Sequence, residues 1–423
     1  MNLIKTSVFS AIITFVRISS GFFAGKIIAM LTGPIGVASV GALTNFISIA
    51  LTIGNGAINN GVVKYVAEYK QDQEKSKLLI STSFKITFYC SLLVSTLILI
   101  FAKKITILIF GNIENKNVII VLGVTLIFYT LNSLVLSILN GISEIKKYTV
   151  INAIGSIVSL FLTILLVFYF EVKGALYSIV LSQLIVFVFT VFLLRKSRII
   201  SKKSFTGKFD KKICFKLSHF SLMALVSSLT IPISQILLRN IISDELGINA
   251  AGYWQGMIRV SDGYLMLITT SLSVYYLPKL SSLVSRSEIR NEVLNGYKII
   301  LPTVLIGCII IYFFRFHVIE LLFSKKFIVM ESLFFWQLIG DFFKMASWIL
   351  SFLLVAKAKT KIFIFTEIGF VFFYVTISYF FLKEFGLVGT TIAFALNYFI
   401  YFISMLLIFK KLLFKKSLIS DEK

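Results

Sequence analysis

Residues 195–216 have the sequence RKSRIISKKSFTGKFDKKICFK, and this stretch decides the organisation of the chain. It contains nine Lys or Arg residues against a single acid, Asp210, and long apolar segments lie on both sides of it. Such a stretch is typical of a cytoplasmic connector, because loops rich in Lys and Arg stay on the cytoplasmic side of a membrane. A docking patch for anionic lipid or for a partner is the alternative. We therefore predict an N-terminal lobe with the basic connector over residues 1–205, and a C-terminal lobe with a basic cytoplasmic tail over residues 206–423.

The composition is that of a membrane protein. Hydrophobic residues make up 58% of the chain, charged residues make up 14%, and the mean hydropathy is +0.94. These values differ strongly from those of soluble domains. The net charge of +23 comes largely from Lys and Arg residues between the apolar segments, so we expect a polytopic membrane protein and no nucleic-acid partner.

The sequence offers no motif for an enzyme, a metal or a nucleotide. Cys90, Cys214 and Cys308 are isolated, which supports neither a zinc site nor a disulfide framework. The segment from Gly21 to Lys26 resembles a phosphate-binding loop, but it has three residues between its glycines and no Ser or Thr after the lysine. We therefore expect no cofactor, no metal and no catalytic activity. Proton coupling, sodium coupling or the gradient of the substrate itself would have to drive transport.

Apolar segments long enough to cross a membrane, about 20 residues each, recur along the whole chain. We predict twelve spans, at residues 4–30, 37–65, 78–101, 118–139, 148–170, 175–194, 217–241, 250–277, 293–314, 332–355, 362–382 and 388–412. Placing both termini in the cytoplasm leaves most Lys and Arg residues in cytoplasmic segments. The expected fold is an all-α polytopic membrane protein with twelve transmembrane helices in two six-helix lobes around a central cavity, with both termini cytoplasmic.

Among the basic residues within predicted spans of the first half, three are candidates for a binding site: Arg17, Lys26 and Lys64. A charge at membrane depth is costly and usually faces a protein interior or an aqueous cavity. Arg17 is near the middle of its span, and we favour a cavity over a structural ion pair because the first half has few acids at that depth. Lys26 and Lys64 are nearer to span ends, where a lysine can extend to the membrane surface.

The second half has paired charges within its spans. Arg259 and Asp262 are three residues apart, as are Asp341 and Lys344, so each pair lies on a single helix face. These pairs either neutralise themselves or bind a coupling ion or the substrate. The nearby aromatic residues fit either an interfacial belt or the wall of a glycan cavity. The candidates for that wall are Tyr253, Trp254, Tyr264 and Trp336.

Motifs along nearly the whole chain resemble those of bacterial flippases for polyprenyl-diphosphate-linked oligosaccharides. They include Gly33-Pro34-x-Gly36, Asn60-Gly61-Val62-Val63-Lys64-Tyr65-Val66-Ala67-Glu68-Tyr69, Tyr253-Trp254-Gln255-Gly256 and Trp336-Gln337-Leu338-Ile339-Gly340-Asp341. The resemblance is to the O-antigen flippases and the lipid III flippases of enterobacterial common antigen synthesis. Both belong to the polysaccharide transport branch of the multidrug/oligosaccharidyl-lipid/polysaccharide exporter superfamily. The resemblance implies alternating access and a cationic cavity that binds the diphosphate, with Arg17 as first candidate ligand and Lys26 and Lys64 as further ones.

The function implied is that of a flippase, not an enzyme. It would move an undecaprenyl-diphosphate-linked oligosaccharide, the O-antigen repeat unit, from the cytoplasmic to the periplasmic leaflet of the inner membrane. A lipid III flippase is the first alternative. A multidrug/cation antiporter is less favoured, because it would place acids rather than Arg17 in the cavity, and a glycan polymerase or ligase would need larger outer loops. The expected partners are the lipid-linked glycan, membrane lipid, and an O-antigen polymerase with its chain-length regulator.

Overall fold

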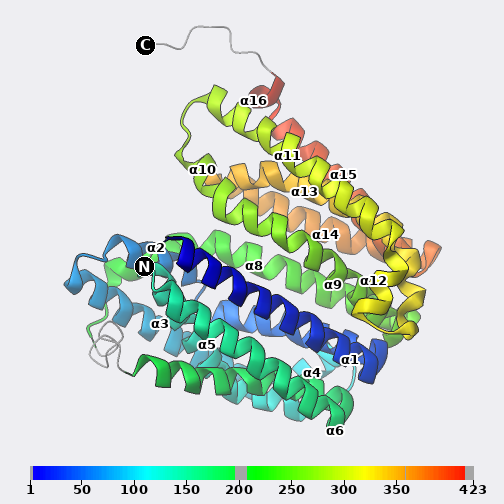
Figure 1. The fold of residues 1–423 in the computed structure, drawn as a ribbon, viewed down its shortest axis with the longest axis horizontal. Helices are drawn as coiled ribbons and strands as arrows, with labels where there is room; N and C mark the ends of the chain where they lie inside the picture. Colours follow the sequence, from blue (N-terminus) through cyan, green and yellow to red (C-terminus); the bar gives the residue numbers. More distant parts are fainter. Residues whose placement is uncertain (1–2, 196–206, 358, 415–423) are drawn as a thin grey trace. The chain divides into compact units, whose positions relative to one another are not determined.

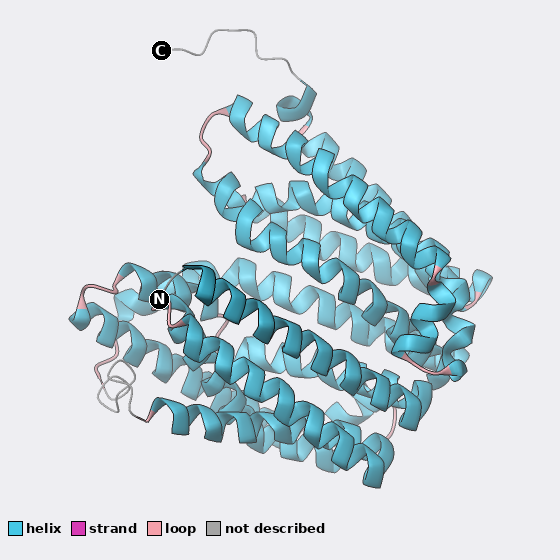
Figure 2. Ribbon diagram, in the orientation of Figure 1, coloured by secondary structure: helices cyan, strands magenta, loops and turns pink. Residues whose placement is uncertain are grey.

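The computed structural model describes residues 3–195, 207–357 and 359–414, and every regular element within them is a helix, as Figure 1 and Figure 2 show. The first half contains α1 (Leu3–Gly54), α2 (Asn59–Glu68), α3 (Gln73–Ile100), α4 (Ala102–Phe110), α5 (Lys116–Gly141) and α6 (Ile145–Leu194). The second half contains α8 (Lys211–Leu246), α9 (Ile248–Ser271), the π-helix η1 (Leu272–Tyr276), α10 (Leu277–Ser282), α11 (Arg286–Phe313), α12 (Arg315–Leu322), the 3-10 helix η2 (Lys325–Leu333), α13 (Phe334–Ala356), α14 (Thr360–Phe385), α15 (Leu387–Ile408) and α16 (Lys410–Phe414).

The chain divides into two compact units. Unit 1 comprises Met1–Ile236 with Leu322–Ser324, and unit 2 comprises Leu237–Leu321 with Lys325–Lys423. The first part of α8 thus belongs to unit 1 and its last part to unit 2. Residues 196–206, which form much of the basic connector, lie outside the described residues, so the domain boundary at residues 205 and 206 stays a prediction.

Four sharp corners share one backbone pattern, in which a residue with positive φ is followed three positions later by a small residue. The pairs are Gly33 and Gly36, Glu171 and Gly174, Gly247 and Ala250, and Gly386 and Gly389, with φ values of 63°, 47°, 85° and 59° at the first residue of each. The small residue is needed because the chain folds back closely: a Cβ on Gly174 would lie 1.9 Å from the Leu166 carbonyl oxygen, and one on Gly389 would lie 1.9 Å from that of Phe381.

The two corners of the first half recur in the second half at nearly the same interval. Gly33 and Gly247 are 214 positions apart, and Glu171 and Gly386 are 215 positions apart. Gly33 lies between the predicted spans at residues 4–30 and 37–65, and it forms one of these corners, inside α1. The matched spacing supports an internal repeat, which residue identity between the halves did not reveal.

Some predicted boundaries are wrong. The span at residues 37–65 ends early, because α1 stops at Gly54 and α2 starts only at Asn59. Between them Gly56 and Ala57 have φ values of 62° and 52°, which a continuous helix does not tolerate. Two segments that lie between predicted spans, residues 103–116 and 315–329, are largely helical, in α4, α12 and η2.

The membrane character of the fold is confirmed. Within the described residues, nine helical stretches are long and apolar enough to cross a membrane, and two of them, in α1 and α6, bend at Gly33 and Glu171. The all-α polytopic class therefore holds. The count of twelve spans and the cytoplasmic position of both termini stay predictions.

Candidate functional site

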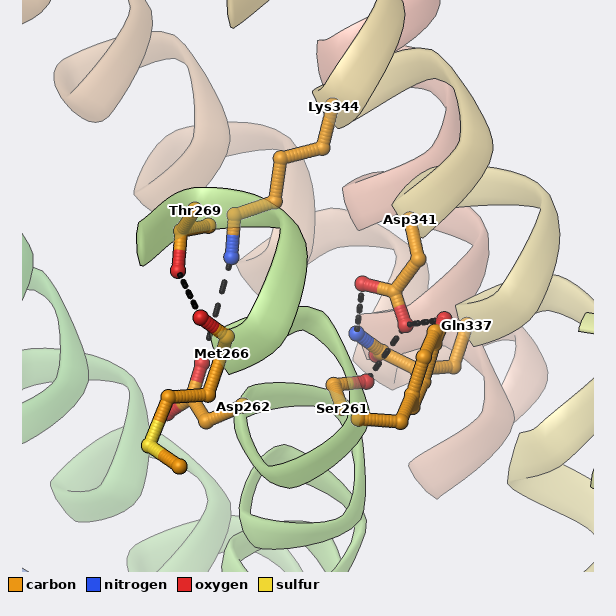
Figure 3. A network of polar contacts seen from close by, with 8 residues as sticks. Ser261, Asp262, Met266, Thr269, Gln337, Asp341 and Lys344 are labelled. Carbon is orange, nitrogen blue, oxygen red and sulfur yellow. Dashed lines mark hydrogen bonds and ion pairs between the residues drawn. The ribbon is translucent and has the colours of Figure 1, made fainter. Parts of the chain in front are cut away.

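A buried carboxylate lies between α9 and α13 of unit 2. Asp341 of α13 has no exposed surface, and hydroxyl groups of α9 supply its closest contacts. Ser261 Oγ donates to Asp341 Oδ2 at 2.6 Å and Tyr264 Oη donates to the same oxygen at 2.7 Å, while Gln337 Nε2 lies 3.4 Å from Oδ1 (Figure 3). The hydrogen-bond donors around this carboxylate are thus all neutral, and no described Lys, Arg or His side-chain nitrogen lies within 4.0 Å of its oxygen atoms.

The sequence spacing places these donors. Ser261 and Tyr264 are three residues apart on α9, so their side chains share a helix face. Gln337 precedes Asp341 by one turn of α13. Tyr264 Oη also lies 3.6 Å from Cys308 Sγ, so α11 joins the network. Sequence analysis missed Ser261, Gln337 and Cys308 as site residues, because hydroxyl, amide and thiol groups inside apolar helices carry no charge signal.

The charged residues nearby pair between helices. Lys344 Nζ lies 3.9 Å from Asp262 Oδ1, with the lysine side chain 13% exposed and the aspartate 62% exposed. Figure 3 shows Lys344 extending from α13 toward Asp262 on α9. The ammonium is also 5.1 Å from the centre of the Trp348 ring. The pairs three residues apart therefore do not neutralise themselves in the described structure; α9 and α13 share one cross-helix pair instead.

Arg259 is left without a counterion by this arrangement. It is half-buried near the middle of α9, and among the described residues it has no hydrogen bond and no ion pair. Asp262, three residues farther along the same helix, forms its ion pair with Lys344 instead. A half-buried guanidinium without a counterion is suited to bind an anion that enters from outside the protein.

The predicted glycan-wall aromatics have different surroundings. Tyr264 lies in the Asp341 network, and Trp254 is only 1% exposed, which places it in the core rather than on a cavity wall. Tyr253 packs edge-on against Phe327. Trp336 is 37% exposed on α13. Of these four aromatic residues, only Tyr264 contacts one of the predicted acids, Asp341.

The structure describes the side chains of two of the three predicted diphosphate ligands of the first half, Lys26 and Lys64. Arg17 belongs to α1, but its side chain lies outside the described part of the structure. Lys26 is half-buried farther along α1. Lys64 is exposed on α2, where its ammonium lies 5.3 Å from the centre of the Tyr65 ring. No described contact joins Lys26 to Lys64.

Comparison with known proteins identifies relatives over nearly the full length. The family described as "Polysaccharide biosynthesis protein" matches residues 36–332. Two relatives named lipid III flippase, from Escherichia coli (strain K12) and Shigella flexneri, are each 28% identical over 407 residues, covering 95% of this chain and 97% of theirs.

Solved structures with the same fold are transporters. An inward-facing multidrug resistance MATE family transporter of the MOP superfamily matches with a TM-score of 0.77 at 18% identity, covering 94% of this chain and 98% of its own. A MOP superfamily transporter from Pyrococcus furiosus matches with a TM-score of 0.70 at 15% identity, covering 97% and 95%.

These matches confirm the resemblance seen in the sequence. The protein has the fold of a transporter and not of an enzyme, and it is a multi-pass protein of the inner membrane. Because the family match extends over more than half of its residues, the chain belongs to the polysaccharide biosynthesis protein family.

Proposed function

We propose that this protein is a flippase for a polyprenyl-diphosphate-linked oligosaccharide. Such a cargo carries two phosphates, a polar glycan and a long apolar tail. A protein that moves it needs a cationic side chain that can bind phosphate. The observation that carries the proposal is Arg259, a guanidinium without a described counterion in a chain whose relatives are named flippases. Arginine can bind phosphate through two parallel hydrogen bonds.

Arg17 is the second proposed phosphate ligand. Placing an arginine side chain near mid-membrane costs roughly 2.5–3.5 kcal/mol of free energy on insertion scales, and an anionic partner would offset this cost. The diphosphate is the one anion that every cargo molecule of this class carries. Lys26 and Lys64 are weaker candidates, because Lys64 is exposed and already lies against the Tyr65 ring.

The glycan is proposed to be of the lipid III type. Sequence analysis placed the O-antigen repeat unit first, but the two full-length relatives are named lipid III flippases. Sequence identity of 28% does not by itself assign the same substrate to both proteins, so the O-antigen unit is the second candidate. If it is the cargo, the O-antigen polymerase and its chain-length regulator are the expected partners.

Asp341 is proposed as the coupling site. A buried carboxylate without a cation is costly, and uptake of a proton or a sodium ion removes that cost. Ser261 and Tyr264 supply two more oxygen atoms at 2.6 and 2.7 Å that could stay close to a bound cation. Asp262 is 62% exposed and already lies 3.9 Å from the Lys344 ammonium, so it is the less suitable acid.

Complementation tests the proposal in cells that lack their own lipid III flippase. The wild-type chain should restore the glycan, Arg259→Gln should lose it, and Arg259→Lys should retain part of the activity because it keeps the charge. Lys103→Gln is the matched control: it removes one positive charge from an exposed position on α4 and should restore the glycan fully. Full restoration by Arg259→Gln at normal abundance would refute the role of Arg259.

A parallel strain that lacks an O-antigen flippase separates the two glycans. We expect stronger restoration in the strain without the lipid III flippase. The reverse order would favour the O-antigen unit. Restoration in neither strain, combined with export of a cationic dye, would support an antiporter instead.

A further inference from the structure

Among the described residues, no charged side chain lines either of two pockets of unit 1. The first, with a volume of about 460 Å³, lies between α1, α5 and α6, and the second, of about 550 Å³, lies between α1, α2, α5 and the first part of α8. The polar residues of the first are Ser20, Tyr129, Asn132, Ser133, Asn152, Ser156, Ser159 and Gln183. Those of the second are Ser48, Thr52, Asn55, Asn59, Asn60, Ser133, Ser227 and Ser228. Both volumes lie within the usual range for small-molecule sites, about 300–1,000 Å³.

Ser133 of α5 belongs to both pockets. Asn59 Nδ2 donates to Ser133 Oγ at 2.9 Å, and Asn55 Nδ2 lies 3.5 Å from the same oxygen. This contact fixes the chain where α1 ends and α2 begins, at the two positive φ values of Gly56 and Ala57. The broken helix thus places two carboxamides beside a serine shared by both pockets.

Three carboxamide oxygens at these pockets, those of Asn55, Asn59 and Asn132, have no hydrogen-bond partner in the described structure. Asn55 is 4% exposed and Asn132 is 3% exposed, and Oδ1 of each is buried and unpaired. Buried polar atoms of native proteins nearly always have a partner. Each oxygen accepts hydrogen bonds and cannot donate, so the missing partner is a donor.

The lining determines which part of the cargo fits. The described residues of both walls include no cation that could bind the diphosphate, and their many amide and hydroxyl groups do not suit an apolar tail. Sugar hydroxyl and acetamido N–H groups are neutral donors. Arg17, a proposed phosphate ligand, is three residues before Ser20 on α1, one helical turn from the first pocket.

We propose that these two pockets bind the uncharged sugars of the glycan, with Asn55 and Asn132 accepting hydrogen bonds from sugar hydroxyl or acetamido N–H groups. This inference rests on the proposed flippase function and assigns it a sugar-binding region. The amides act as specificity determinants, while the cations bind the diphosphate.

Binding to the purified full-length protein in lipid nanodiscs tests the inference. The two probes are undecaprenyl diphosphate that carries an acetamido-sugar oligosaccharide and undecaprenyl diphosphate without sugar. We expect Asn55→Leu and Asn132→Leu each to raise the Kd of the glycan-bearing lipid about fivefold to tenfold, as loss of one hydrogen bond does. The Kd of the sugar-free lipid should stay unchanged.

Asn397→Leu is the matched control. Asn397 of α15 is 4% exposed and its Oδ1 is also unpaired, but it belongs to unit 2, so this variant should leave both Kd values unchanged. Thermal unfolding identifies any leucine variant that is misfolded, and Asn132→Asp, which keeps the shape and the acceptor oxygens, should then retain binding of the glycan-bearing lipid.

Three outcomes would overturn the inference. Unchanged Kd values in folded Asn55→Leu and Asn132→Leu would show that these amides do not contact sugar. Equal binding of both lipids to the wild-type protein would refute sugar recognition while leaving the flippase function intact. Failure of the wild-type protein to bind either lipid would refute the flippase function as well.

Discussion

The ammonium of Lys344 lies 3.9 Å from the carboxylate of Asp262 on the neighbouring helix. The acid on its own helix, Asp341, is instead enclosed by Ser261, Tyr264 and Gln337. The contact between α9 and α13 therefore separates two kinds of acid: Asp262 is exposed and ion-paired, whereas Asp341 is buried among neutral hydrogen-bond donors. This separation is the basis for assigning coupling to Asp341.

Asp341→Asn should uncouple transport from the ion gradient. The amide has the shape of the acid but no charge for a proton or sodium ion to neutralise. We expect flipping that no longer responds to a proton or sodium gradient, and thermal stability equal to or above that of the wild type, because a buried charge has been removed. Asp262→Asn, at an exposed position, should keep the gradient dependence. Wild-type gradient dependence in Asp341→Asn would exclude this acid.

Tyr264→Phe should lower the stability of unit 2. It removes a 2.7 Å hydrogen bond to a buried carboxylate, and hydrogen bonds to charged groups contribute about 1.5–3 kcal/mol. Thermal unfolding in detergent measures the change. Tyr312→Phe on α11 is the control, because no hydrogen bond of its hydroxyl is found in the described structure, and it should change little. Equal stability of the two variants would contradict the network.

Glu171→Gly should stabilise the protein. Glu171 has a φ of 47° and a ψ of −123°, a conformation that costs a non-glycine residue about 1–3 kcal/mol. The matched corner residue in the second half is Gly386, and Gly386→Glu should lower the unfolding temperature. Glu384→Gly, in the last turn of α14, serves as the control and should not raise the unfolding temperature, since Glu384 has no positive φ for glycine to relieve. A lower unfolding temperature for Glu171→Gly would refute backbone strain at this corner.

Sequence alone predicted the class of fold, the break between spans around Gly33 and the helix faces that carry Arg259, Asp262, Asp341 and Lys344. It did not predict that Lys344 pairs with Asp262, because spacing along one helix does not specify which neighbouring helix packs against it. The neutral pockets were also missed. Serine and asparagine are common at helix contacts in membranes, so Ser133 and Asn132 become distinctive only when the unpaired carboxamide oxygens are located.

Arg17→Ala should abolish the cell-surface glycan while the protein stays folded and at normal abundance. The reason is loss of a proposed phosphate ligand, so Arg17→Lys should keep part of the activity. Surface glycan and membrane abundance are measured together. Full surface glycan would remove Arg17 from the mechanism, whereas loss of the folded protein would identify Arg17 as a structural ion-pair partner.

Reconstitution into liposomes tests the central claim most directly. Labelled undecaprenyl-diphosphate-linked oligosaccharide is placed in the inner leaflet, and its arrival in the outer leaflet is followed with a membrane-impermeant reagent that oxidises sugar diols. The account predicts that the protein exposes the inner-leaflet glycan within minutes and that Arg259→Gln liposomes resemble protein-free ones. Exposure no faster than in protein-free liposomes, with the folded protein present under every imposed ion gradient, would contradict the flippase function.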